Sequence, residues 1–403
     1  MPNIAFIINS LSNGGAERTI SNITNNLPPN FRCDIIVNCD SEIIYPVKGN
    51  IIPLGFRPEK NKLKIRYQAV AFLRRVRALK KLKKNNDYVA VFSFSESASI
   101  ANILSGKDHC KIILSVRNHL SSRSCEWKYR FFVFPIIKML YGYADKIVAV
   151  SEGVRVDLIK NFGIKESKAM TIPNGCDVNR IEEMSLEELS QKEAELLSYD
   201  SVIVTMGRLE HQKGQWHLIR ALRAVKDRGL RFRLLILGQG SMLDTLKEVA
   251  LNNGLQEDVR FLGFCNNPFR ILRNADLYVL PSLFEGMVNS LIEALACGLP
   301  CISTDHNAGA REILAPKSDV ELKNVDRIER AEYGIMIPVP NGQIERGRTK
   351  LSPEESLLAD AIAELLSNKS LRENYRLKAI ERSKTMAIEH TITMWMDLVE
   401  KVI

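Results

Sequence analysis

The sequence lacks the marks of several protein classes. Its densest apolar run, residues 131–137, is shorter than the roughly 18 residues of a membrane-spanning helix and contains Pro135. The N-terminus has neither the basic flank nor the cleavage site of a signal peptide, so we expect residues 4–8 to form a buried strand. No repeat at solenoid period and no low-complexity tract occurs. These absences favour a globular protein of the cytoplasm.

Disulfide and zinc patterns are missing as well. The eight cysteines form no Cys-x-x-Cys pair; they are at positions 33, 39, 110, 125, 176, 265, 297 and 301. Several lie in apolar runs, where cysteine behaves as a small hydrophobic residue. We therefore expect neither a disulfide framework nor a metal site, and a reducing compartment fits this usage.

Short apolar runs alternate with helical stretches along the 403 residues, which is typical of doubly wound α/β domains. The expected strands lie near residues 4–9, 33–38, 89–94, 111–116, 146–150, 202–206, 233–237, 259–262, 277–281 and 300–303. Because these runs are apolar throughout, the strands should be parallel and covered on both faces. The length itself predicts at least two domains, at about 150 residues each.

Turn residues at 172–177, followed by a polar, acidic stretch at 182–195, indicate a domain boundary. We predict an N-terminal domain over 1–180 and a C-terminal domain over 181–375. Two or three amphipathic helices should close the chain from about Pro353, and the last, within 376–403, should pack back on the N-terminal domain. Ligands of such sheets bind beyond the carboxyl ends of the strands, so a cleft between the domains is the expected site.

The most informative stretch is Pro281–Thr304, in which a strand, a loop with Glu285 and a helix follow one another. The helix should begin near Asn289 and end at Gly298, which suits a helix C-terminus. Free N–H groups at the start of a helix form an anion site that fits a diphosphate. Glu293, one turn inside the helix, and Glu285 before it can accept hydrogen bonds from sugar hydroxyls beside that group.

A second loop, after the expected strand at 202–206, carries Arg208 and Lys213 between Gly207 and Gly214. Two cations five residues apart can pair with the charged groups of a diphosphate. Two surface cations without a function are the alternative.

Two stretches of the first half also follow expected strands. Asn13–Arg18 reads Asn-Gly-Gly-Ala-Glu-Arg, and its glycines let a ligand approach the backbone, although it is neither a P-loop nor Gly-x-Gly-x-x-Gly. The strand at 111–116 is followed by three polar residues, Arg117, Asn118 and His119. His119 could hold a sugar hydroxyl or assist an acceptor, and a structural histidine is the alternative.

The stretch 281–304 closely resembles the signature of family 4 of the retaining GT-B glycosyltransferases. In that family two glutamates are separated by seven residues within a pattern matched here by Glu285, Gly286, Asn289, Glu293, Ala294, Ala296, Gly298 and Pro300. The family's Gly-Arg…Lys-Gly and Asn-Gly-Gly-Ala-Glu-Arg motifs match the other two loops, and the resemblance covers nearly the whole chain. It implies the GT-B fold, an α/β architecture of two Rossmann-like doubly wound domains facing across a cleft, with C-terminal helices closing the chain.

The resemblance also implies roles for individual residues. Glu293 would bind the nucleotide ribose, and Glu285 would lie near the donor sugar. Arg208 and Lys213 would clamp the departing diphosphate, and with Glu285 and His119 they are the expected catalytic residues. The other implied donor-binding positions are Gly14, Gly15, Gly207, Gly238, Gly263, Phe264, Gly286, Met287, Val288 and Asn289. Arg117 and Asn118 are the expected acceptor or sugar contacts.

The sequence departs from the family pattern at Met287 and Val288, which replace an aromatic residue or proline and leave the donor sugar open. The stretches 317–330 and 343–350 are longer and more charged than expected. They could be acceptor or regulatory loops, and plain surface insertions are the alternative. No Asp-x-Asp occurs, the pair through which metal-dependent transferases bind their cation. We therefore expect no metal and no cofactor, with charge on the leaving diphosphate stabilised by cations and a helix N-terminus.

The net charge of +9 is concentrated in one segment, Lys60–Lys84, which has eleven Lys or Arg and no acid. Without these eleven, the other 45 Lys and Arg are balanced by 47 Asp and Glu. Apolar residues at helical spacing predict an amphipathic helix whose other arc is cationic, with Arg74, Arg75, Arg77, Lys80 and Lys81. Such a helix is typical of contact with an anionic membrane, and a solvated helix face is the alternative.

Together these features predict a retaining transferase that moves a hexose or N-acetylhexosamine from a nucleotide sugar, with UDP the expected nucleotide. The expected acceptor is a lipid-linked saccharide of bacterial surface-glycan biosynthesis (polysaccharide, O-antigen or capsule), at the inner face of the plasma membrane. A nucleotide-sugar epimerase of the same architecture is the enzymatic alternative. The non-enzymatic alternative is a basic nucleic-acid-binding protein. No recognition motif or aromatic–basic interleaving supports it, so nucleic acid is not an expected partner.

Overall fold

The computed structural model describes residues 1–12, 14–39, 43, 45–56, 65–124, 126–306, 308–322 and 326–402, with the side chains of 65–68 excepted. Its contacts divide the chain into two units, Met1–Asn174 with Glu389–Ile403, and Gly175–Ile388. The chain thus leaves the first unit after Asn174 and returns to it after Ile388, whereas the sequence placed these changes after residues 180 and 375.

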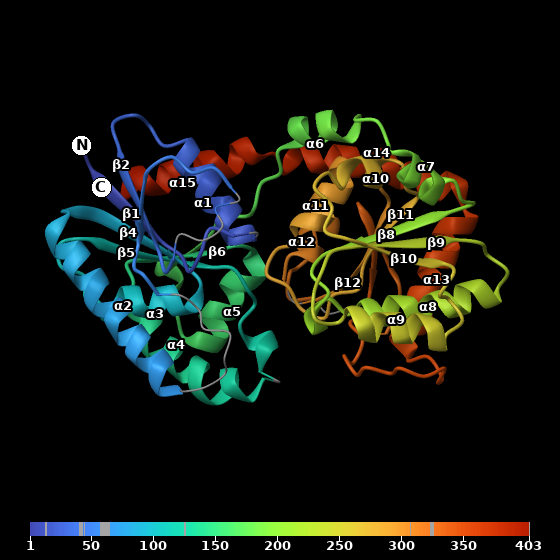
Figure 1. Ribbon diagram of the computed structural model, residues 1–403, viewed down its shortest axis with the longest axis horizontal. Helices are drawn as coiled ribbons and strands as arrows, with labels where there is room; N and C mark the ends of the chain where they lie inside the picture. The colour runs from blue at the N-terminus through green and yellow to red at the C-terminus, as the bar shows by residue number, and fades with distance from the viewer. Residues whose placement is uncertain are drawn as a thin grey trace. The chain divides into compact units, whose positions relative to one another are not determined.

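The first unit is built on a parallel sheet with helices on both faces (Figure 1). Its described strands, in the spatial order β3-β2-β1-β4-β5-β6-β7, are β1 (Asn3–Ile7), β2 (Arg32–Val37), β3 (Asn50–Pro53), β4 (Tyr88–Phe94), β5 (Lys111–Val116), β6 (Lys146–Ala149) and β7 (Ala169–Thr171). Its α-helices are α1 (Gly15–Asn25), α2 (Ile65–Asn85), α3 (Glu96–Leu104), α4 (Phe134–Leu140), α5 (Glu152–Phe162) and α15 (Ile388–Lys401). Helices α1 and α15 bury Ile20 and Trp395 against one face of the sheet, and α2 and α3 bury Leu79 and Ala98 against the other.

The second unit repeats this architecture (Figure 1). Its strands lie in the order β10-β9-β8-β11-β12-β14-β13 and are β8 (Val202–Met206), β9 (Arg233–Leu237), β10 (Val259–Gly263), β11 (Leu277–Leu280), β12 (Cys301–Thr304), β13 (Glu329–Ala331) and β14 (Gly334–Ile337). Only the β13–β14 pair, among the strands described, is antiparallel. The α-helices are α6 (Val178–Ser185), α7 (Gln191–Leu197), α8 (Gln215–Asp227), α9 (Leu243–Asn252), α10 (Phe269–Arg273), α11 (Asn289–Ala296), α12 (Ala310–Leu314), α13 (Pro353–Ser367) and α14 (Lys369–Thr385).

The predicted α/β fold is confirmed, and each strand expected from the sequence is present within two residues of its expected ends. Strands β3, β7, β13 and β14 were not predicted. Three of them, β3, β7 and β13, are edge strands of only three or four residues, so their sequences carry little pattern. The fourth, β14, is fully buried but has only four residues.

Each sheet has one place where the direction of strand succession reverses. In the first unit it lies between β1 and β4, because β2 and β3 lie on one side of β1 while β4 to β7 continue on the other. In the second unit it lies between β8 and β11 for the same reason. Open α/β sheets bind ligands beyond the carboxyl ends of the strands at such a reversal, so these two places are the first to inspect.

The basic segment is only partly the cationic face that its spacing predicted. Lys60, Lys62 and Lys64 lie outside the described residues, and Arg66 is one of the residues whose side chain is not described. Arg75 was placed wrongly on the exposed arc, since it is buried and its Nη1 donates to Asn9 Oδ1 at 2.9 Å. Lys83 is also buried. The exposed cations of α2 are Arg74, Arg77, Lys80, Lys81 and Lys84.

Among the residues that the structure describes, no helix is long and apolar enough to cross a membrane.

Candidate functional site

Two loops meet at the reversal between β8 and β11. The first, Gly207–Gly214, follows β8, and the second, residues 281–288, follows β11. The backbone N–H of Leu283 donates to Gln212 O at 2.8 Å, and the side-chain amide of Gln212 donates to Phe284 O at 2.8 Å. Gly214 has φ +60°, and a Cβ there would lie 2.4 Å from Pro281 O. Only glycine therefore permits this close packing of the two loops.

The predicted catalytic residues Lys213 and Glu285 form an ion pair where these loops meet. Lys213 Nζ lies 2.6 Å from Glu285 Oε1. Ser282 Oγ donates to the same carboxylate oxygen at 3.0 Å, and Gln212 Nε2 donates to Oε2 at 3.0 Å. Glu285 is buried and Lys213 partly so. The carboxylate is thus held through both oxygens. It fixes the Lys213 ammonium group beyond the carboxyl ends of β8 and β11.

Three predicted glycines form the backbone beside this pair. The N–H of Gly207 donates to Leu237 O at 3.0 Å, and that of Gly238 donates to Gly263 O at 2.7 Å. Gly238 has φ +138°, and a Cβ there would lie 1.9 Å from Gly207 O, so a larger residue cannot occupy the position. Phe264, which follows Gly263, is exposed. A Cβ at Gly207 would lie 3.1 Å from Lys213 Cε, so the glycine at the end of β8 lets the lysine side chain lie close to the backbone.

The second loop leads into α11, as predicted. Asn289 is the first helical residue, and Val288 precedes it in extended conformation. Gly298, with φ +74°, ends the helix, where Leu299 N donates to Ala294 O at 3.0 Å. Glu293 is half-buried one turn from the helix start. The N–H groups of this start can receive an anion, with a carboxylate within one turn.

The backbone before α11 is held close by a loop after β12. Gly309 has φ +84°, and a Cβ there would lie 3.0 Å from Gly286 O and 3.1 Å from Met287 Cα. On the other loop Arg208 is exposed, and its carbonyl accepts from Gln215 Nε2 at 3.1 Å. In the structure, all the sequence-predicted donor-binding residues of the second unit thus follow the carboxyl ends of strands β8 to β11. Their roles in binding remain predictions.

Arg117, a predicted acceptor contact, braces the start of α1 within the first unit. Its Nη2 donates to Thr19 Oγ1 at 2.8 Å and also to Asn174 Oδ1. Thr19 Oγ1 in turn donates to Gly15 O at 2.8 Å. Burial lowers the pKa of Arg117 to about 10, although Glu17 opposes this. Gly14 is the N-cap of α1 in extended conformation, and Asn13 lies outside the described residues.

His119 is buried after β5, with Asn118 half-buried before it. Its Nδ1 lies 2.8 Å from Ser122 Oγ and 3.9 Å from Asp157 Oδ2. Asp157 is itself fixed by the backbone N–H of Ser121 at 3.1 Å. The imidazole is therefore held through Nδ1, which is compatible with both alternatives, a structural histidine and one that holds a sugar hydroxyl or assists an acceptor.

Sequence reasoning missed three residues of the site. Gln212 and Ser282 hold Glu285, and Gly309 supports the backbone before α11. Ser282 stands three residues before Glu285, a spacing that allows a side-chain contact within a turn, but Gln212 is distant in sequence. No local pattern connects it to the carboxylate.

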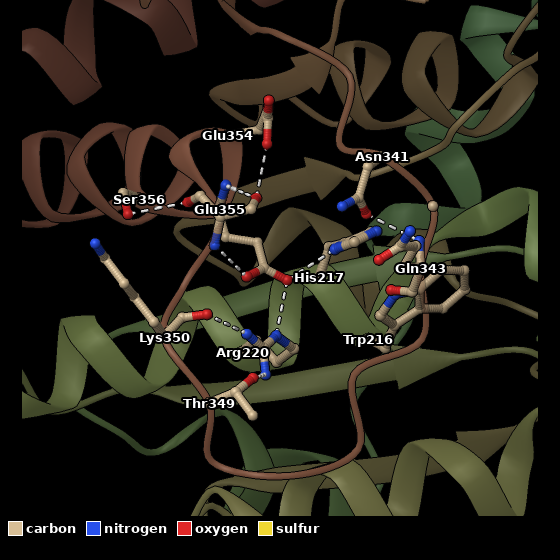
Figure 2. Close-up of polar contacts among 12 residues, drawn as sticks. Trp216, His217, Arg220, Asn341, Gln343, Thr349, Lys350, Glu354, Glu355 and Ser356 are labelled. Atoms are coloured by element: carbon tan, nitrogen blue, oxygen red, sulfur yellow. Dashed lines mark hydrogen bonds and ion pairs between the residues drawn. The ribbon is translucent and has the colours of Figure 1, made fainter.

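The charged stretch 343–350 is fixed to α8 and α13 of the second unit, as Figure 2 shows. Trp216 Nε1 donates to Gln343 O at 2.9 Å, and Arg220 donates to the carbonyls of Gly347 and Lys350 at 3.0 Å each. Glu355 of α13 in turn holds Arg220, with 2.8 Å between its Oε1 and Arg220 Nε. The stretch is therefore an anchored part of this unit.

Within the described ranges no three His, Cys, Asp or Glu residues come together in a way that could hold a metal ion. The cysteines described there are free thiols.

Comparison with known proteins gives two family matches. Residues 13–180 match the family described as Glycosyltransferase Family 4, and residues 187–332 match Glycosyl transferases group 1. An uncharacterized glycosyltransferase, MJ1059 of Methanocaldococcus jannaschii, is 32% identical over 296 residues, which are 73% of this chain and 72% of that protein.

A second relative comes from Campylobacter jejuni subsp. jejuni serotype O:2 and is named N-acetylgalactosamine-N,N'-diacetylbacillosaminyl-diphospho-undecaprenol 4-alpha-N-acetylgalactosaminyltransferase. It is 28% identical over 397 residues, covering 95% of each chain. Among solved structures, Anabaena Alr3699/HepE in complex with UDP has the same fold, with a TM-score of 0.72, 16% identity and coverage of 100% of both chains.

Proposed function

Because this chain belongs to the glycosyltransferases, in the families described as group 1 and family 4, we propose that it transfers a hexose or N-acetylhexosamine from a UDP-sugar to a lipid-linked saccharide. Membership of these families makes the chain an enzyme that forms glycosidic bonds. It also favours transfer over the two alternatives, an epimerase and a nucleic-acid-binding protein.

The observation that carries the proposal is the pairing of Lys213 with Glu285 beside the start of α11. This cation and the start of α11 both follow the carboxyl ends of strands of one sheet, where a diphosphate would find hydrogen-bond donors on two sides. Glu293, one turn into α11, would accept hydrogen bonds from the hydroxyls of the nucleotide ribose. The Anabaena protein with the same fold was solved with UDP, which supports UDP as the nucleotide.

The Campylobacter relative supports the acceptor class, since its name specifies a saccharide on diphospho-undecaprenol as the substrate. That relative covers 95% of this chain, so both of its units have counterparts here. We infer that the acceptor of this chain is likewise a saccharide on a polyprenyl diphosphate, made for a bacterial surface glycan. The enzyme would then work at the inner face of the plasma membrane.

In the proposed mechanism the bond between the anomeric carbon and the diphosphate oxygen breaks, and negative charge grows on the leaving UDP. Lys213, Arg208 and the N–H groups at the start of α11 stabilise that charge without a metal ion. The acceptor hydroxyl attacks the anomeric carbon on the face that UDP leaves and passes its proton to the departing diphosphate oxygen, so the configuration is retained. Glu285 holds Lys213 in place and lies beside the donor sugar.

A panel of UDP- and GDP-sugars tests the donor, because a ligand that binds only the folded state raises its melting temperature. We expect one or a few UDP-sugars to raise it more than UDP alone. The stabilising sugar is then incubated with and without a short-chain polyprenyl-diphosphate saccharide. Release of UDP that depends on this acceptor supports transfer, whereas conversion of the UDP-sugar without acceptor would establish the epimerase instead.

A further inference from the structure

Residues 127–143 of the first unit form a helical segment that is apolar on two sides. It continues from the π-helical turn η2 (Tyr129–Val133) directly into α4. The inner side is anchored, because Ile137, Leu140 and Tyr141 are buried and Phe134 packs edge-on against Phe162 of α5, with 5.3 Å between ring centroids. The position of the segment is therefore fixed by its inner side.

The outer side of this segment is apolar as well. Five large side chains are 60–65% exposed: Trp127, Phe131, Phe132, Met139 and Tyr143. With Ile136 they recur along the helix at steps of three or four residues, apart from the adjacent pair Phe131 and Phe132, and form a second, broad apolar stripe away from the buried one. A surface helix of a globular protein normally buries one apolar stripe and exposes a polar face, so a second, exposed apolar stripe is unusual. We call these six residues the outer stripe.

Cations flank the outer stripe. From Trp127 to Ala144 the sequence has three cations, Lys128, Arg130 and Lys138, and no acid. All three are exposed. Lys128 Nζ lies 5.8 Å from the ring centroid of Trp127, and the Arg130 guanidinium lies 5.7 Å from that of Phe131. Aromatic rings with cations beside them are the side chains that settle at the boundary between lipid headgroups and acyl chains.

We propose that the outer stripe inserts into the interface of an anionic lipid bilayer, with Lys128, Arg130 and Lys138 on the lipid phosphates. The choice of a bilayer rests in part on the proposed lipid-linked acceptor. It rests also on charge, because a second copy docked on this face would bring like cations together, and Glu126, which directly precedes the segment, is already paired with Arg123. An anionic surface satisfies both the rings and the cations.

The exposed cations of α2 belong to the same side of the first unit. Helix α3 contacts both α2 and α4, and α2 and α3 cover one face of the sheet (Figure 1). The exposed arc of α2 also carries Val70 and Leu73 among its cations. One membrane surface can therefore attract α2 by charge and hold the outer stripe by apolar burial.

The first test uses the full chain with vesicles of phosphatidylcholine alone or mixed with phosphatidylglycerol. Trp127 is 61% exposed, whereas the other two tryptophans of the chain, Trp216 and Trp395, are buried. Insertion of Trp127 should shift the emission of the protein to the blue on mixed vesicles, and brominated acyl chains should quench it. Trp127→Phe should abolish both signals while sedimentation with the vesicles persists.

The second test removes the apolar stripe with Phe131→Ser, Phe132→Ser and Met139→Ser together. Its matched control makes the same change at exposed leucines of the second unit, Leu186, Leu251 and Leu377. We expect the partition coefficient onto mixed vesicles to fall by roughly tenfold or more in the stripe variant and to stay unchanged in the control. Neutralising Arg74, Arg77, Lys80 and Lys81 should weaken binding at low salt only, because charge attraction is screened.

Equal sedimentation of the stripe variant and the wild type, or no blue shift on mixed vesicles, would overturn the proposal. A concentration-dependent dimer in sedimentation velocity that the stripe substitutions abolish would overturn it too, in favour of a second copy. Transfer to a water-soluble acceptor should be normal in the stripe variant. A wild type that binds vesicles but transfers no sugar would refute the proposed function but not the proposed membrane contact of the outer stripe.

Discussion

Lys213 Nζ lies 2.6 Å from Glu285 Oε1, although the two residues belong to loops after different strands. The ammonium group is thereby held against the loop that leads into α11 before any ligand arrives. A diphosphate bound here would be a second anionic partner for Lys213. Its binding would not have to order the lysine side chain, because Glu285 already does so. Such preorganised charge acts most strongly where negative charge grows during the reaction.

Lys213→Ala and Arg208→Ala should each lower turnover more than donor binding. The charge on the leaving diphosphate increases in the transition state, so we expect kcat to fall by roughly a hundredfold to a thousandfold for Lys213→Ala. Steady-state kinetics and calorimetry of UDP-sugar binding measure the two effects separately. Lys226→Ala, which breaks the exposed pair with Asp258, is the control and should leave both unchanged. A loss confined to binding would show that these cations act only on the ground state.

Glu293→Ala should weaken UDP binding while the fold persists. Hydrogen bonds between a carboxylate and ribose hydroxyls are worth about 1.5–3 kcal/mol, so affinity should fall by roughly tenfold to a hundredfold. Titration calorimetry with UDP measures this, and a melting curve without ligand checks the fold. The exposed Glu257 supplies the control substitution. An unchanged affinity for UDP would rule out the ribose assignment.

Transfer should continue in EDTA. In the proposed mechanism Lys213, Arg208 and the start of α11 stabilise the leaving diphosphate, so no cation need be supplied. The assay compares initial rates after dialysis against EDTA with rates in added magnesium or manganese. Full loss of activity in EDTA that either metal restores would contradict this mechanism.

Lys83 should make stability depend on pH above neutrality. Burial lowers its pKa from 10.5 to about 8, while its Nζ donates to Asn102 O at 2.8 Å and Gly106 O at 2.7 Å. Between these two pKa values the unfolded chain binds more protons than the folded chain, so this residue's contribution to the free energy of unfolding rises with pH. Urea denaturation from pH 7 to 10 should therefore show a gap between wild type and Lys83→Met that changes with pH. Lys80→Met, at an exposed position of α2, is the control for removing a lysine from the same helix.

Glu355→Gln should destabilise the second unit. Glu355 accepts from Arg220 Nε at 2.8 Å, and both side chains are buried, so the substitution leaves Arg220 without its carboxylate. Breaking one partner of a buried ion pair costs about 3–5 kcal/mol. Urea denaturation measures the loss, and hydrogen exchange at residues 343–350 should rise as their anchor weakens. Glu354→Gln, at a partly exposed neighbour, should cost far less, and equal losses would point to a general effect on α13.

How much the sequence could predict differs from element to element. Strands such as β5 and β8 are found at their expected ends, because a parallel strand covered on both faces is a continuous apolar run. The short strands β13 and β14 carry too few residues for any period to appear. The glycine-bounded loops were readable because their backbone geometry depends on the glycines themselves.

The sequence by itself thus determined the two α/β units, the loops after β8 and β11, and the residue types that suit a diphosphate. Only the tertiary structure decided which of those residues meet. The pair of Lys213 with Glu285, and Gln212 with the same carboxylate, joins positions more than seventy residues apart. No local pattern encodes such a contact, because it depends on the order of the strands in the sheet.

Which side chains are buried was likewise decided only by the tertiary structure. Arg75 and Lys83 each stand four residues from Leu79 on the buried side of α2, where a count of charges had placed Arg75 on the surface. Conversely, the apolar residues from Trp127 to Tyr143 would suit a core on both sides of their helix, but only one side is covered. Helical spacing tells which side chains share a face, whereas the neighbouring elements determine which faces are covered, and those neighbours are set by the packing of the whole unit.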